Sequence, residues 1–252
     1  ALTYNNYFTL EGFNAHNAGN PTSINVTVVN INYSSYNILR RICAWEAADG
    51  NTNVFGVHNG DYNLLEDCAG WGTARKTFSN SQQGNYTTFR RCFGRWEGSH
   101  AEGPKKTFGV SYNSYNALLE NCIGTWDGLK MQQAYELHDY SGVGVGKNFS
   151  NYEVQQPDGI FSHDGFDVLP DVANARLYGC IAYIKANQRY HNSFKKWAAP
   201  FAFEIKGIDI RNCLSFIQPG SYADIWNVNL SSVGNTTTNN VDGLTQIGGE
   251  LG

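Results

Sequence analysis

The chain has 252 residues, only 16% charged residues and a formal net charge of −4. This weakly acidic balance does not attract the phosphate backbone of a nucleic acid, so we expect no nucleic-acid partner. No apolar run approaches the ~20 residues needed to span a bilayer, and we therefore expect no membrane span.

A short unit recurs along most of the chain. Its copies lie at residues 7–13, 36–42, 61–68, 85–92, 115–122, 175–180 and 208–213. The copies share alternating apolar and polar positions that lead to a small apolar residue, and most open on an aromatic residue. Self-similarity at such a period indicates a solenoid, and the alternation predicts that each unit is a strand and not a helix.

Two copies carry an apolar-x-Asn-Cys-apolar strand, LENCI at residues 119–123 and IRNCL at residues 210–214. This pattern resembles the pectate-lyase-like superfamily of right-handed parallel β-helices. The resemblance implies an all-β, right-handed parallel β-helix of about eight coils. We expect this domain to cover residues 1–235, with residues 236–252 as a polar tail or linker rich in Gly, Thr and Asn.

Three columns of stacked side chains are predicted inside the coils. The first contains Leu39, Leu65, Phe89, Leu119, Leu177 and Ile210. The second is a phenylalanine stack at Phe55, Phe78 and Phe108. The third contains Cys68, Cys92, Cys122, Cys180 and Cys213. Coils ~4.8 Å apart allow such cysteines to be bridged or free, and a buried column of free thiols is the favoured interpretation.

A tryptophan follows four of the units, at Trp45, Trp71, Trp96 and Trp126. If these side chains point outward, they form a stripe on which sugar rings can stack. If they point inward, they form a corner of the core, which we favour because Tyr183 and Phe216 continue the position with apolar residues.

Acidic residues gather where the repeat becomes irregular, at Asp139, Asp158, Asp164 and Asp167. Asp164 follows Asp139 by 25 residues, which is about one regular coil and predicts neighbouring side chains. Carboxylates gathered in this way provide the oxygen ligands that Ca²⁺ requires. The alternative, which we favour, is that Asp-Gly pairs at these positions serve turns.

The segment DGFD at residues 164–167, followed by FEIKG at residues 203–207, looks like the Ca²⁺-dependent polysaccharide lyases of family nine. The resemblance implies that the aspartates bind Ca²⁺ and that a lysine abstracts the proton α to a uronate carboxylate. Glu204 stands at the position of the family's lysine, and Lys206 has the same strand parity. Lys206 and Glu204 are therefore the candidate catalytic residues.

A surface rich in Asn, Ser, Thr, Gly and Tyr favours an extracellular or cell-surface location. We rank a structural β-helix module first, one that assembles head to tail into a filament through the unpaired edges of its end coils. A Ca²⁺-dependent lyase or another enzyme acting on an acidic polysaccharide ranks second. A non-catalytic sugar-binding or adhesin domain ranks third. Ca²⁺ is the one cofactor that the sequence suggests.

Overall fold

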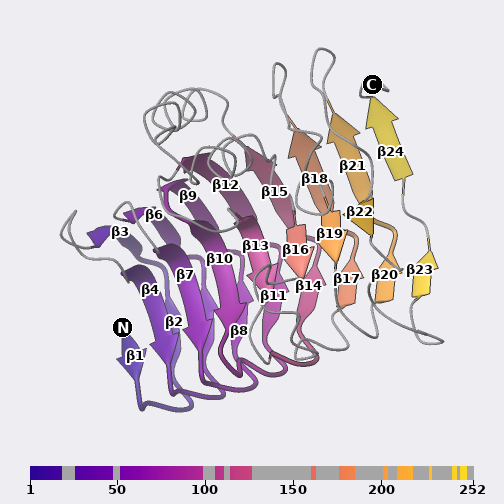
Figure 1. Cartoon of the computed structure of the whole chain (residues 1–252). Helices are drawn as coiled ribbons and strands as arrows, with labels where there is room; N and C mark the ends of the chain where they lie inside the picture. Colours follow the sequence, from indigo (N-terminus) through magenta and orange to yellow (C-terminus); the bar gives the residue numbers. More distant parts are fainter. Residues whose placement is uncertain are drawn as a thin grey trace, which may run out of the picture.

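The structure, a computed structural model, describes the chain in separate stretches. They are residues 1–18, 26–47, 52–98, 106–110, 114–126, 160–162, 176–184, 201–203, 209–217, 227–228, 240–242 and 245–248. Within these stretches every regular element is a β-strand, and the strands form three parallel sheets (Figure 1).

The strands are divided equally among the sheets. Sheet A contains β1 (Leu2–Thr3), β4 (Thr27–Asn32), β7 (Asn53–His58), β10 (Lys76–Ser81), β13 (Lys106–Val110), β16 (Ile160–Ser162), β19 (Phe201–Phe203) and β22 (Asn227–Val228). Sheet B contains β2 (Thr9–Glu11), β5 (Ile38–Arg40), β8 (Leu64–Glu66), β11 (Thr88–Arg90), β14 (Leu118–Glu120), β17 (Arg176–Tyr178), β20 (Asp209–Arg211) and β23 (Asn240–Asp242). Sheet C contains β3 (Asn14–Ala18), β6 (Cys43–Ala47), β9 (Ala69–Thr73), β12 (Phe93–Gly98), β15 (Ile123–Trp126), β18 (Ile181–Ile184), β21 (Leu214–Ile217) and β24 (Thr245–Gly248).

The chain visits sheets A, B and C in turn, and each strand pairs in parallel with the strand one round earlier. Successive rounds therefore stack side by side from the indigo N-terminal end to the yellow C-terminal end (Figure 1). The all-β stack of parallel sheets fits the predicted parallel β-solenoid.

Sheets B and C are always joined by a two-residue connection. Its first residue has a positive φ at Gly12, Arg41, Asp67, Arg91, Asn121, Gly179 and Asn212. The N–H of this residue donates to the last strand residue of the next coil, as from Arg41 to the Glu66 oxygen at 3.1 Å. This hydrogen bond offsets the ~1–2 kcal/mol that a left-handed conformation costs a residue with a Cβ atom.

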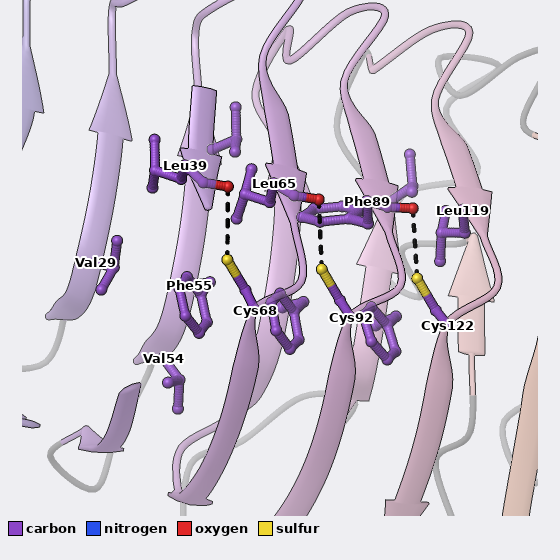
Figure 2. Packing of buried hydrophobic residues seen from close by; sticks show 14 of the residues in the cluster. Val29, Leu39, Val54, Phe55, Leu65, Cys68, Phe89, Cys92, Leu119 and Cys122 are labelled. Carbon is purple, nitrogen blue, oxygen red and sulfur yellow. Dashed lines mark hydrogen bonds between the residues drawn. The ribbon is translucent and has the colours of Figure 1, made fainter. Parts of the chain in front are cut away.

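The two predicted apolar columns are confirmed. Leu39, Leu65, Phe89, Leu119 and Leu177 are at most 1% exposed, and their backbones pair in register with each other and with Ile210. The rings of Phe55, Phe78 and Phe108 stack with centroids 4.6 and 4.7 Å apart. Figure 2 shows Leu39, Leu65, Phe89 and Leu119 as successive members of the first column.

Small residues in sheet C make room for the phenylalanine stack. A Cβ atom at Gly70 would lie 3.2 Å from the ring of Phe55, and one at Gly94 would lie 3.1 Å from the ring of Phe108. Since both contacts are tighter than ordinary packing, the large residues of sheet A require glycine opposite them.

The cysteine column is buried and its thiols are free, as predicted. Each thiol also donates a weak hydrogen bond to the backbone of the preceding coil. Figure 2 shows the Cys68, Cys92 and Cys122 sulfurs pointing at the Leu39, Leu65 and Phe89 carbonyl oxygens, at 3.6, 3.4 and 3.4 Å. These contacts tie sheet B to the following turn in successive coils.

The structure describes part of the C-terminal segment that we expected to be a tail or linker. Residues 236–252 contain β23 and β24, which pair with β20 and β21. Val241 pairs with Ile210, and Ile247 pairs with Phe216.

Removing one ring from the phenylalanine stack should weaken the whole column. We expect Phe78→Ala to lower the free energy of unfolding by about 3–5 kcal/mol, because it leaves a cavity between two rings. The matched control is Phe93→Ala, since Phe93 is 37% exposed, and it should cost less than about 1 kcal/mol. Urea unfolding followed by circular dichroism measures both, and equal losses would contradict the stacked core.

Candidate functional site

Six of the predicted site residues lie outside the described residues. They are Asp139, Asp158, Asp164, Asp167, Glu204 and Lys206. The strands around them are described, and β16 pairs with β19 so that Ser162 lies beside Phe203. The segments 163–175 and 204–208, which hold Asp164, Asp167, Glu204 and Lys206, therefore begin at neighbouring positions of sheet A.

The coil containing Asp139 and Asp164 is longer than the spacing argument assumed. Leu119 pairs with Leu177, and the connection 127–159 is inserted between β15 and β16 within this coil. A separation of 25 residues is therefore not one coil in this part of the chain. Asp139 and Asp164 both lie outside the described residues, so the Ca²⁺ site stays a prediction.

Trp45 and Trp71 lie on the outer face of sheet C. Both side chains are half-buried, and they alternate along their strands with the buried Ala44 and Gly70. Their ring centroids are 5.1 Å apart and their planes differ by 4°. These two tryptophans therefore form part of an outer column and not the corner of the core that we favoured.

The stacking limits what this outer column can bind. The ring of His16 lies 4.7 Å from the ring of Trp45, with an interplanar angle of 11°. Trp45 is thus covered on one face by His16 and on the other by Trp71. Because sugars stack on the faces of aromatic rings, Trp45 can offer a sugar only its edge.

The four tryptophans do not occupy one register position. Trp71 pairs with Arg95, whereas Trp96 pairs with Gly72 and with Trp126. Gly72 has a φ of 94°, and a register shift follows Trp96. The single stripe of four tryptophans expected from the sequence is therefore two pairs displaced by one residue.

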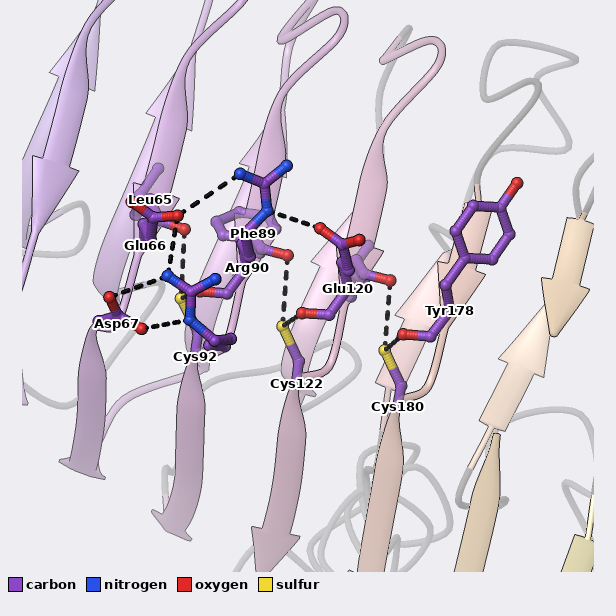
Figure 3. Close-up of polar contacts among 12 residues, drawn as sticks. Leu65, Glu66, Asp67, Phe89, Arg90, Cys92, Glu120, Cys122, Tyr178 and Cys180 are labelled. Carbon is purple, nitrogen blue, oxygen red and sulfur yellow. Dashed lines mark hydrogen bonds and ion pairs between the residues drawn. The ribbon is translucent and has the colours of Figure 1, made fainter. Parts of the chain in front are cut away.

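A ladder of charges covers the outer face of sheet B, and the sequence analysis did not predict it. Glu66 forms ion pairs with Arg40 at 2.8 Å, with Arg91 at 2.9 Å and with Arg90 at 3.4 Å. Arg90 also pairs with Glu120 at 2.6 Å (Figure 3). The signal was present as a charged residue after the same apolar position of each unit, at Arg40, Glu66, Arg90 and Glu120.

The environment of Glu66 makes it a structural carboxylate. Burial raises the pKa of Glu66, but hydrogen bonds from Arg91 and Arg90 and the charge of Arg40 outweigh this and hold the pKa below its ordinary value. A carboxylate with three arginine partners is a poor proton acceptor at neutral pH. We therefore assign Glu66 to the cohesion of coils and not to catalysis.

His58 is the one described histidine with a strongly shifted pKa. Burial and the positive charge of Lys76 lower the pKa of His58 to about 4, so its ring is neutral at pH 7. Its Nδ1 lies 2.8 Å from the Ser81 hydroxyl oxygen. Ser81 is 3% exposed, and every residue of β10 is buried, whereas His58 is half-buried, so the Ser81 hydroxyl is not open to a solute.

No protein-family model matches the chain, and comparison with curated proteins finds no match. Among the described stretches, no group of three or more His, Cys, Asp or Glu side chains is placed to hold a metal ion. The same stretches contain no helix of the length and apolar character that crossing a bilayer demands.

The pKa of His58 predicts a specific pH dependence. Between its ordinary value of 6.5 and about 4, the unfolded chain binds a proton at His58 that the folded chain does not bind. We expect unfolding free energy to fall by about 3 kcal/mol at most as pH drops through this window. His58→Gln should remove the dependence, and the exposed His16→Gln should retain it. Urea unfolding at pH 7, 5.5 and 4.5 measures the effect, which a pH-independent wild-type stability would contradict.

Proposed function

We propose that the chain is a right-handed parallel β-helix of the pectate-lyase-like type, with each round of three strands forming one of about eight coils. The parallel return of every third strand supports this fold, because crossover connections between parallel strands are right-handed in about 98% of cases. The positive-φ residue before each cysteine supports it as well, since the LENCI and IRNCL units place Asn121 and Asn212 there.

We infer that this β-helix serves as a structural module outside the cell or on its surface. One observation carries the proposal: the outward side chains of the regular coils bind one another. Arg40, Glu66, Arg90 and Glu120 are paired along sheet B, and Trp45 is stacked on both faces along sheet C. Groups used in this way hold neighbouring coils together and stiffen the stack.

The structural role includes head-to-tail assembly of copies. Among the described strands, those of the first coil pair with those of the second, and Tyr4 and Tyr7 on the first coil are 74% and 76% exposed. Each of these rings stacks on a tyrosine of the next coil, Tyr33 or Tyr36. The last coil of a second copy can extend the three sheets, and a contact of this heterologous kind propagates.

Sedimentation velocity and electron microscopy over a concentration series test this assembly. We expect filaments whose length grows with concentration, and Tyr7→Glu should shorten them by placing a charge at the junction. Tyr62→Glu is the matched control, because Tyr62 occupies the same ladder between Tyr36 and Tyr86 inside each copy. A wild-type protein that stays monomeric at every concentration, with its first coil covered by other residues, overturns the proposal.

A polysaccharide lyase is the second candidate, and the pairing of Ser162 with Phe203 favours it. Segments 163–175 and 204–208 contain the DGFD and EIK residues of the lyase resemblance, and both follow adjacent strands of one sheet. Acid–base chemistry between them requires this kind of proximity.

Incubation with uronate polymers and Ca²⁺ tests the lyase directly, through the ultraviolet absorbance of unsaturated products. We expect Lys206→Ala to reduce the rate by about 10²–10⁴-fold, the usual contribution of a general base. Asp164→Asn should raise the Ca²⁺ concentration needed for activity, and Lys185→Ala, outside the motif, should leave the rate unchanged. Absence of product from all uronate polymers tested with Ca²⁺ would remove this candidate.

A further inference from the structure

The five inward cysteines form a continuous chain of thiols. They are Cys68, Cys92, Cys122, Cys180 and Cys213, and each is at most 2% exposed. The N–H that follows a cysteine donates to the carbonyl oxygen of the cysteine one coil earlier, as from Phe93 to Cys68, Ile123 to Cys92, Ile181 to Cys122 and Leu214 to Cys180 at 2.8–2.9 Å. Figure 3 shows Cys92, Cys122 and Cys180 in equivalent positions on successive coils. Consecutive members of the column therefore lie on adjacent coils, one strand spacing apart.

The spacing of the coils suits a disulfide between neighbours and between no other members. Neighbouring strands of a sheet lie ~4.7–4.9 Å apart, and disulfides join Cα atoms that are ~4.4–6.8 Å apart. Neighbouring members of the column are therefore within the reach of a disulfide. Members separated by two coils are therefore about 9–10 Å apart, beyond the reach of a disulfide. Cys43 stands apart from this chain, because it is half-buried on sheet C and pairs in register with Asn14 and Ala69.

We propose that this column is an oxidation site at which adjacent cysteines form disulfides that staple successive coils. The oxidant is a small-molecule disulfide such as oxidised glutathione. Because each thiol enters only one bond, the five members close at most two staples and leave one thiol. This inference concerns the core of the coils and is independent of the proposed structural or enzymatic role.

The reaction is a thiol–disulfide exchange in two steps. A cysteine thiolate attacks the oxidant, forms a mixed disulfide and releases one small thiolate. The neighbouring cysteine thiolate then attacks the protein sulfur of the mixed disulfide and releases the second small thiolate. Two protein thiols are oxidised, one oxidant disulfide is reduced to two thiols, and the two protons lost by the cysteines go to the released thiolates.

Burial determines when this exchange can occur. The Cys122 and Cys180 side chains are 0% exposed and the other members of the column are at most 2% exposed, so the folded column offers no thiol that an oxidant can reach. We therefore expect exchange while the chain folds or when coils open. A protein folded under reducing conditions should keep its thiols when oxidant is added afterwards.

Oxidative refolding followed by alkylation in denaturant counts the staples by mass. The wild-type chain has six cysteines, and after refolding with oxidised glutathione we expect two reactive thiols, Cys43 and one member of the column. Refolding under reducing conditions should give all six. The oxidised form should also have the higher thermal midpoint, because each staple closes a loop between coils.

Two matched variants distinguish neighbour pairing from random oxidation. Cys122→Ala leaves the pairs Cys68–Cys92 and Cys180–Cys213, so two staples should still form and only Cys43 should react. Cys92→Ala isolates Cys68 and should form a single staple, leaving three reactive thiols. Both substitutions remove one buried thiol from a middle coil, so their effects on folding should be similar.

Peptide mapping of the oxidised wild-type protein provides a test that needs no variant. We expect cross-linked peptides that join consecutive members of the column. Six reactive thiols after oxidative refolding would overturn the proposal. So would links between Cys68 and Cys122, links to Cys43, or equal thiol counts in the two variants.

Discussion

The structure depends on the constant turn between sheets B and C. Each turn has two residues, and its positive-φ residue donates a backbone hydrogen bond to the next coil, as Asp67 does to the Arg90 oxygen at 3.0 Å. Because the turn never changes length, the residues before and after it are held at fixed register from coil to coil. A one-residue slip would move every inward side chain to the outside, so this turn defines the core.

Fixed register places chemically similar residues above one another. These residues stabilise neighbouring coils through ring stacking in some columns and through hydrogen bonds in others. At the turn between sheets A and B, Tyr36, Tyr62 and Tyr86 also have positive φ, which costs each ~1–2 kcal/mol. Their rings stack at 5.0 and 4.6 Å, and each pair contributes about 0.5–1.5 kcal/mol. Inside the same turn, the Asn63 side chain accepts from the Asn37 backbone at 3.0 Å and donates to the Ser34 oxygen at 2.9 Å. Stacked rings and hydrogen bonds of this kind offset the conformational cost of the positive-φ residues in these turns.

The sequence predicted what depends on regular alternation and missed what depends on local exceptions. The columns of Leu65 and of Phe78 follow from the two-residue period of a strand, so they were accessible from the sequence alone. The four tryptophans do not share one position because Trp71 follows Cys68 by three residues and Trp96 follows Cys92 by four, so Trp96 pairs with Gly72 and not with Trp71. Asp139 and Asp164 lie outside the described stretches, so their proximity stays a prediction. To predict the ion pairs of Glu66, one must know which residues of different coils lie side by side on the same face of the sheet. Only the register of the strands supplies this.

The fixed register also determines where the chain can vary in length. The turn between sheets B and C cannot accept insertions without breaking the backbone ladder, whereas the connections 127–159, 163–175 and 185–200 all adjoin strands of sheet A. Side chains on the regular coils are already engaged with one another, as Glu66 is with its arginines. The additional chain length is therefore concentrated in the connections that adjoin β16 and β19. The regular coils determine the spacing at which those connections leave the stack, so the rigid part of the chain sets the geometry for its variable part.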